Sequence, residues 1–141
     1  MRLKNGELIA VSGALDTLSK EKFPIAFSFI VARTLKSIAS QVETYGEYRQ
    51  ELIEKYAKRD DDGEKITRDN GITVEMNAGW KEELKELDDL HGDELDGIST
   101  KQLIKQCDKG KINIQASVLF GLSSILIDDV ETKDEKDGSE E

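Results

Sequence analysis

Apolar residues near the start of the chain repeat with the period of an α-helix. Leu8, Val11, Leu15 and Leu18 follow one another at intervals of three or four positions. That spacing places them on one face of a helix. Asn5 precedes the pattern, and its side chain can accept a hydrogen bond from a free backbone N–H. The pattern predicts a helix after an extended start, with Asn5 as its N-cap.

A longer helical pattern begins at Pro24, the only proline of the chain. Proline is favourable at a helix start, where its missing N–H would have no partner. Helical spacing of apolar residues then continues almost to Arg59, which predicts a helix about 50 Å long. Gly46 is the expected place for a bend. We expect the first helix to fold back on the first half of this long helix, and later segments to cover the rest.

The segment "KRDDDGEKI" (58–66) is similar to the start of a calcium-binding EF-hand loop. With Gly63 at the sixth loop position, Lys58 takes the place of the first ligand and Lys65 that of an apolar residue. Asp69 stands where a longer, bidentate Glu is needed. We therefore expect no metal at this segment, and interpret it as the exit from the long helix, with Gly63 making the turn.

A period-two pattern follows the acidic run. Ile66 precedes Asn70-Gly71, and Ile72, Val74 and Met76 alternate with polar residues after it. Asn-Gly between alternating segments is a strong hairpin signal, because both residues tolerate the positive φ of a type I′ turn. We expect a small β-hairpin that protrudes, since its second face is polar. It needs support from a helix, a third strand or a partner.

Two shorter helices are expected next. Asn77 is a suitable cap for a helix ended by Gly92, whose apolar stripe consists of Trp80, Leu84, Leu87 and either Leu90 or His91. Ser99 or Thr100 is a suitable cap for a helix ended by Gly110, whose inward residues are Leu103, Ile104 and Cys107.

The most apolar segment lies near the C-terminus. Ile112 and Ile114 alternate as in a strand, and a buried helix is expected to contain Val118, Leu119, Leu122, Ile125 and Leu126. The fold predicted from all these patterns is α+β and mainly helical: a helical hairpin with one long helix, a β-hairpin after Gly63, and C-terminal helices. Residues 1–130 are expected to form one globular domain, and residues 131–141 an acidic flexible tail.

Charge is distributed unevenly along the 141 residues, whose net charge is −10. Residues 1–58 contain nine basic and seven acidic residues, whereas residues 59–141 contain eleven and twenty-three. Negative charge of this size repels nucleic acid and anionic membrane surfaces. We therefore expect no direct nucleic-acid binding, and a protein with a basic surface as partner.

Compartment and chemistry are constrained by what the sequence lacks. Cys107 is the only cysteine, so neither an intrachain disulfide nor a zinc cluster can form. No signal peptide and no stretch of membrane-span length is recognised, so we expect a cytoplasmic protein that does not enter the membrane. Phosphate-binding glycine motifs are absent. His91 has no nucleophile tied to it, and Asp108 beside Cys107 disfavours a thiolate. We expect neither an enzyme nor a cofactor.

Several segments resemble a family of small, uncharacterised proteins from tailed phages and prophages of Gram-positive bacteria. The resemblance rests on "LKNGELIAVSGALDTL", "ARTLKSI", "YRQELIEKYAKRDDDGEKI", the hairpin and "KEELKELDD". It covers roughly the first ninety residues, and the C-terminal part departs further. The resemblance implies a phage accessory protein acting in the cytoplasm of an infected or lysogenic host. It implies no functional residue.

Two functions remain open on this basis. The first is a non-catalytic protein that binds a host or phage protein through an acidic surface, inhibiting or competing at a basic surface that holds nucleic acid. The acidic residues expected to form that surface are Asp60, Asp61, Asp62, Glu82, Glu83, Glu86, Asp88 and Asp89.

The alternative is a virion-assembly or structural accessory protein that works as a homo-oligomer. It would use a second stripe of the long helix, for which the candidates are Phe29, Ala32, Ala39 and Tyr45.

Overall fold

A computed structural model describes residues 1–128 of the chain. The predicted tail, 131–141, lies outside these residues. The fold is mainly helical α+β, as the sequence predicts. Its helices are α1 (Leu8–Ser19), α2 (Ile25–Tyr56), α3 (Trp80–Asp88), α4 (Thr100–Gly110) and α5 (Ala116–Leu122), with a 3-10 turn, η1 (Asn5–Glu7), before α1. Its strands are β1 (Arg2–Lys4), β2 (Thr67–Arg68), β3 (Thr73–Val74), β4 (His91–Glu94), β5 (Ile98–Ser99) and β6 (Leu126–Ile127).

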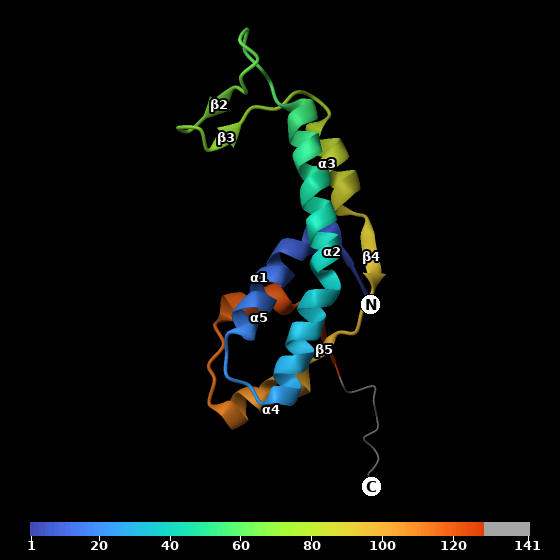
Figure 1. Cartoon of the computed structure of the whole chain (residues 1–141), viewed down its shortest axis with the longest axis vertical. Coiled ribbons are helices and arrows are strands. Elements are labelled where there is room, and N and C mark those ends of the chain that lie inside the picture. Colours follow the sequence, from blue (N-terminus) through green and yellow to red (C-terminus); the bar gives the residue numbers. More distant parts are fainter. Residues whose placement is uncertain (129–141) are drawn as a thin grey trace.

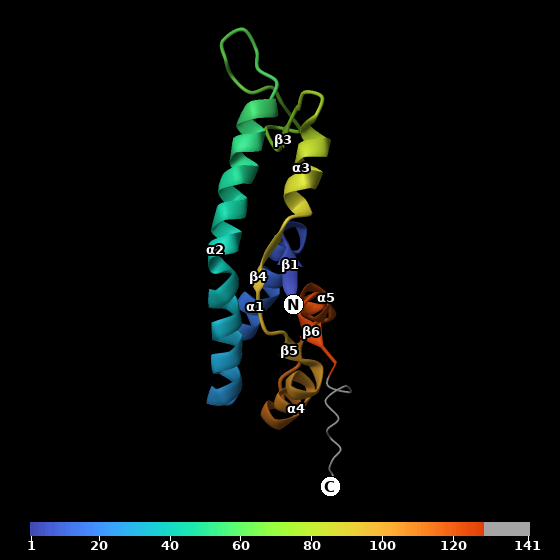
Figure 2. The ribbon, with the colours of Figure 1, turned by 90° about the vertical axis from the view of Figure 1, so that its right-hand side faces the viewer.

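The helical hairpin predicted for the N-terminal part is confirmed. α2 runs along most of the molecule, and α1 packs against its first half (Figures 1 and 2). Leu8, Val11, Leu15 and Leu18 are all at most 1% exposed, so the apolar face read from the sequence is the one that packs. Pro24 is the N-cap of α2. α3 covers the second half of α2, as expected of a later segment.

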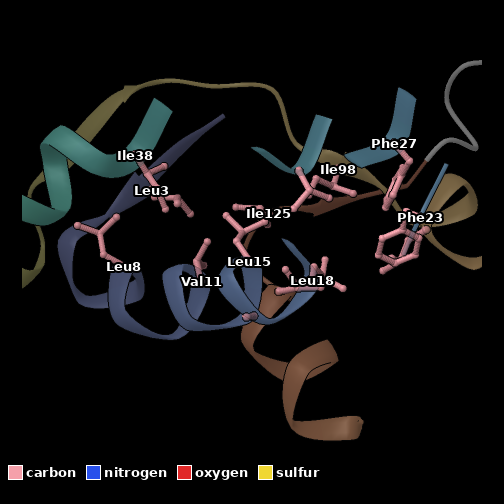
Figure 3. Packing of buried hydrophobic residues seen from close by; sticks show 14 of the residues in the cluster. Leu3, Leu8, Val11, Leu15, Leu18, Phe23, Phe27, Ile38, Ile98 and Ile125 are labelled. Atoms are coloured by element: carbon pink, nitrogen blue, oxygen red, sulfur yellow. The ribbon is translucent and has the colours of Figure 1, made fainter. Parts of the chain in front are cut away.

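The core lies between α1 and the first half of α2, and segments from both chain ends complete it (Figure 3). Leu3 enters from β1, and Ile98 and Ile125 enter from the C-terminal part, each at most 1% exposed. Because side chains distant in sequence close this core, the C-terminal segments are needed to shield α1 from water.

Asn5 does not cap the first helix, contrary to the sequence prediction. The amide Nδ2 of Asn5 donates to the carbonyl of Leu87 at 2.8 Å, and its Oδ1 accepts from Gln41 Nε2 at 2.9 Å. The backbone N–H of Lys4 donates instead to Glu7 Oε1 at 2.8 Å. Asn5 is therefore a buried polar contact that joins η1 to α2 and to the end of α3.

The boundaries of α3 also differ from the prediction. Asn77 does not cap it; the N-cap is Gly79, with φ of 99°. The helix ends at Asp88, and Gly92 lies in β4 instead of closing the helix. His91 likewise begins a strand, where it pairs with Lys4.

The cap of α4 is Ser99, whose hydroxyl accepts from the backbone N–H of Gln102 at 3.1 Å. Leu103 faces inward as expected, but Ile104 is 57% exposed, which contradicts its assignment to the inward face. Gly110 is the last residue of the helix and not the stop after it. Lys111 takes the left-handed conformation there, with φ of 54°.

The C-terminal segment is less regular than predicted. Ile112 and Ile114 pack against the core without forming a strand. α5 ends at Leu122, so Ile125 is buried beyond the helix instead of within it. Leu126 lies in β6, which pairs in parallel with β5.

The chain start forms a second pairing that periodicity did not indicate. β1 pairs with β4 antiparallel, placing Arg2 beside Glu94. The N-terminal amine forms an ion pair with Glu94, and Arg2 Nε donates to the carbonyl of Gly92 at 2.9 Å. This pairing holds the segment after α3 against the N-terminus.

The β-hairpin after Gly63 is confirmed and protrudes from the body (Figure 1). Asn70 and Gly71 have φ of 59° and 88°, as a type I′ turn requires. Asp69 also has positive φ, 55°, which the sequence did not indicate. The hairpin is supported by a third extended segment, because the N–H of Lys58 donates to the carbonyl of Glu75 at 2.9 Å.

α2 continues without interruption through Gly46. It contains an 18-residue window of mean hydropathy 1.2, long and apolar enough by length and composition to cross a membrane. The expectation that no segment reaches this length is therefore wrong on those two criteria. Core helices of water-soluble folds that are mostly buried meet the same two criteria, whereas 22% of this window is buried inside the fold.

Candidate functional site

The second half of α2 and the neighbouring α3 enclose a groove of about 930 Å³. From here on we call it the α2/α3 groove. Leucines and an aromatic ring supply its apolar part, and carboxylates stand beside them. Its lining consists of Tyr48, Glu51, Leu52, Lys55, Glu83, Glu86, Leu87, Asp89 and Leu90. Tyr48 is 55% exposed and Leu90 59%, so apolar surface remains open to water between the two helices.

Four of the residues of α2 in the groove share one side of that helix. Tyr48, Glu51, Leu52 and Lys55 occupy positions i, i+3, i+4 and i+7. On α3, Glu83, Glu86 and Leu87 have the corresponding spacing, followed by Leu90 just beyond the helix. The groove is thus the seam between two helix faces that the fold only half buries.

Both ends of α3 are fixed to the rest of the fold. At its start, the N–H of Asn77 donates to the carbonyl of Tyr56 at 2.7 Å, and Gly79 lies against the Tyr56 ring. At its end, the Tyr45 hydroxyl donates to Asp88 at 2.7 Å. Tyr45 is only 7% exposed, so its assignment to a second, outward stripe of α2 is wrong. These contacts set the width of the groove.

The groove is acidic even though Lys55 and Glu83 in its lining form an ion pair. Lys55 is the only cation in the lining, and its ammonium lies 2.9 Å from Glu83. Hydrogen bonds from Lys55 and from Tyr56 hold the pKa of Glu83 below its usual value, and the same pair raises the pKa of Lys55. Glu51 and Glu86 make no ion pair within residues 1–128.

A second hollow, of about 560 Å³, continues the groove toward β4. The two share Tyr48, Leu87 and Leu90. Hydroxyl and amide groups from α2 line the continuation, together with His91 and Asp93 from β4. The combined surface therefore passes from an acidic, apolar seam to a polar end.

The eight acidic residues expected to form one surface are divided by the fold. Glu83, Glu86 and Asp89 line the α2/α3 groove, whereas Glu82 is exposed on α3 outside its lining. Asp88 is half-buried and bonded to Tyr45.

The remaining three expected residues lie elsewhere. Asp60, Asp61 and Asp62 belong to the loop beyond the end of α2, which projects away from the body (Figure 1). The Asp60 carboxylate accepts from the N–H groups of Asp62 at 2.9 Å and Glu64 at 3.0 Å. That carboxylate therefore stabilises a turn.

His91 and Cys107 lie on different elements, β4 and α4. His91 is exposed at the polar end of the groove continuation. Burial raises the pKa of the Cys107 thiol, and Asp108 and Glu21 raise it further, so a thiolate is disfavoured. Among residues 1–128, no three His, Cys, Asp or Glu side chains are placed to hold a metal ion.

Comparison of the chain with protein-family models, with curated proteins and with solved structures gave no match. The groove combines apolar and acidic groups on one surface. Its exposed apolar side chains could pack against an apolar surface, and its carboxylates could pair with cationic groups. An amphipathic helix with a basic face would supply both.

Proposed function

We propose that this chain is a non-catalytic binding protein that holds a basic amphipathic helix of another protein in the α2/α3 groove. The observation that supports this most directly is the combination of exposed Tyr48 and Leu90 with the unpaired carboxylates of Glu51 and Glu86. An apolar helix face would cover the first pair, and Lys or Arg side chains at its edges would reach the second. The partner's apolar residues would follow the i, i+3, i+4, i+7 spacing that such grooves select.

The setting of this binding follows from the sequence resemblance and is part of the proposal. In a phage or prophage accessory protein, acting in the cytoplasm, the partner is a host or phage protein whose basic surface otherwise holds nucleic acid. Occupying that surface would inhibit nucleic-acid binding by competition. Negative charge on this chain would also speed the encounter with such a partner, and salt would slow it.

The test uses a defined probe: a fluorescent peptide of about 14 residues, or four helical turns, with leucines on one face and lysines on the other. Fluorescence anisotropy at about 0.15 M salt measures its affinity for the full chain. A peptide of the same length with glutamates in place of the lysines is the first control. Binding of the lysine peptide alone, weakened by added salt, is the expected result.

Matched charge reversals locate the binding. Glu51→Lys and Glu86→Lys should each weaken peptide binding, and together about tenfold, because two rim carboxylates change from attraction to repulsion. Glu82→Lys is the control for the α3 substitution, since it makes the same charge change on the same helix outside the groove lining. Tyr48→Ser should also weaken binding by removing apolar contact.

Equal losses from Glu82→Lys and Glu86→Lys would contradict the proposal. Peptide binding would then depend on net charge and not on the groove. Failure of the lysine peptide to bind at all would contradict it as well.

A further inference from the structure

The side of α2 that faces away from the core carries an ordered set of exposed residues. Figure 2 shows α2 along one edge of the molecule, with the rest of the described fold on its other side. At helical spacing, the outward residues are Ile25, Phe29, Ala32, Lys36, Ala39, Glu43 and Glu47, all exposed. We call this set the outer face of α2. Ile25 is 88% exposed and Phe29 62%, which leaves large apolar groups uncovered.

Charge on the outer face changes sign halfway along it. Lys36 lies before the pair Ala39–Ser40, and Glu43 lies the same number of residues after it. Further out, Arg33 lies six residues before the pair and Glu47 seven residues after it, so these two opposite charges fall within one residue of the same relation. None of these four residues forms an ion pair within the described part of the chain. The charge pattern of the outer face is therefore complementary to the same face of a second chain that runs antiparallel to it.

The exposed aromatic ring of the outer face has a polar counterpart at the same distance from the centre. The exposed Phe29 ring, with Arg33 5.7 Å from its centroid, projects from the first half of α2. Phe29 and Gln50 each lie about 16 Å along the helix from the centre of Ala39–Ser40, at about 1.5 Å per residue.

We propose that a second copy of this chain packs antiparallel on the outer face of α2, about a two-fold axis at Ala39–Ser40. The small side chains at the axis let the two helices approach closely. Lys36 of each copy then lies opposite Glu43 of the other, and Phe29 of each lies beside Gln50 of the other. Because the interface is self-complementary, every contact is made twice, as a closed two-fold dimer requires.

Charge complementarity favours a second copy over a membrane surface. A helix that binds anionic lipid has basic residues along its polar face, whereas this face has two carboxylates in its second half. The chain's net charge of −10 also opposes approach to an anionic surface. No residue of the outer face lines the α2/α3 groove, so a dimer would leave two grooves open and bind bivalently.

A charge-swap experiment on the full chain tests the pairing. Analytical ultracentrifugation over a range of concentrations gives the dimer dissociation constant. Lys36→Glu and Glu43→Lys should each raise it about tenfold or more, because each places like charges opposite one another twice. The double variant restores opposite charges and should restore dimerisation. Lys101→Glu, an exposed change of the same sign on α4, should have little effect.

Two results would overturn the proposal. One is a wild-type chain that stays monomeric up to about 1 mM, which corresponds to a binding free energy of only about 4 kcal/mol. The other is a double variant that dimerises no better than either single variant. Peptide binding in the groove can be measured on the monomeric variants, so failure of the dimer and failure of the proposed function are distinguishable.

Orientation is tested by cysteine crosslinking in a Cys107→Ser background, which removes the only native thiol. Ala39→Cys should form a disulfide-linked dimer, since the two copies of this position lie beside the axis. Ile25→Cys should not, because an antiparallel pair separates the two thiols by about 40 Å along the helix. Crosslinking at both positions would indicate parallel packing and overturn the assignment. Binding to phosphatidylglycerol vesicles without dimerisation, abolished by Phe29→Ser, would assign the face to a membrane surface instead and would also overturn it.

Discussion

Residues 43–90, which we call the hairpin end, contain only two buried apolar side chains, Tyr45 and Ala57. The rest of the described chain, the core end, contains fourteen. Ion pairs show the opposite distribution, since five of the seven within residues 1–128 lie in the hairpin end. One half of α2 is thus held by close packing, and the other by hydrogen bonds and charges around half-buried leucines.

The difference separates the part that stabilises the fold from the part that is open to a partner. Fully buried side chains contribute most of the stability, because apolar area removed from water is the dominant favourable term. Exposed ion pairs contribute little, typically about 0–1 kcal/mol each. The hairpin end is therefore expected to open more easily than the core end, while its unburied leucines and carboxylates stay available for binding.

The largest expected effect comes from creating a cavity at the core end. Leu15→Ala should lower the free energy of unfolding by about 2–5 kcal/mol, because Leu15 is fully buried between α1 and its neighbours. Leu84→Ala, at a half-buried position of α3, should cost clearly less. Urea unfolding followed by circular dichroism gives both values. Equal losses would contradict the distinction between the two ends.

The next largest loss of stability is expected from a substitution at Gly79, which lies in the hairpin end. A side chain there is strained by φ of 99°, and its Cβ would lie 3.0 Å from the Tyr56 ring. Gly79→Ala should therefore destabilise the protein by about 1–3 kcal/mol. Gly13→Ala is the matched control in α1, where no atom lies within 4 Å of the added Cβ. That control should raise stability by about 0.5–1 kcal/mol. Thermal unfolding of both variants checks the pair, and a neutral Gly79→Ala would show that α3 does not depend on this contact.

Elements stabilised by local sequence were predictable, and contacts between distant segments were not. Helical spacing predicted α1 and α2, and Asn70-Gly71 predicted the hairpin, because neighbouring residues determine both. Nothing local indicated that β1 would pair with β4, or that β5 would pair with β6. The prediction for Asn5 was wrong for the same reason. Its side chain forms hydrogen bonds with the Leu87 carbonyl and with Gln41, which are far away in sequence.

The candidate site was predictable only in part, for a related reason. Acidic residues can be identified in a sequence, but whether they share one surface depends on how α3 packs against α2. Glu83, Glu86 and Asp89 were identified, whereas Tyr48, Glu51 and Leu90 were not. The i, i+3, i+4, i+7 spacing from Tyr48 to Lys55 was a usable signal. It indicates a helix side with both apolar and charged groups, which is typical of a partly covered interface.

A smaller effect is expected from the hydrogen bond that fixes the end of α3. Tyr45→Phe removes the hydroxyl that donates to Asp88 at 2.7 Å and leaves the ring in place. The loss should be about 1–2 kcal/mol, because the acceptor is charged and the donor is almost buried. Hydrogen exchange should show faster opening of α3 amides, with those of α1 unchanged. Uniform acceleration in both helices would mean that the two ends open as one unit.

The smallest effect is a difference in acid sensitivity between the two ends. Hydrogen bonds from Lys55 and Tyr56 lower the pKa of Glu83 in the folded state, and Lys65 and Lys85 do the same for Glu54 and Asp89. The unfolded chain therefore binds more protons than the folded one as pH falls toward the ordinary carboxyl range. The stability from these groups is present above the unfolded pKa, near 4.5 for Glu, and is lost as pH falls through the lowered folded values.

Because all three groups lie in the hairpin end, its amides should lose hydrogen-exchange protection at a higher pH than those of α1. Glu83→Gln, which removes one of these groups and keeps its shape, should reduce the pH dependence of α3 protection. Glu82→Gln is the control, since Glu82 makes no ion pair within residues 1–128. An unchanged pH dependence in Glu83→Gln would show that packing of the half-buried leucines, and not the Lys55–Glu83 pair, holds α3 on α2. The two ends would then differ in degree of burial and not in the kind of contact that stabilises them.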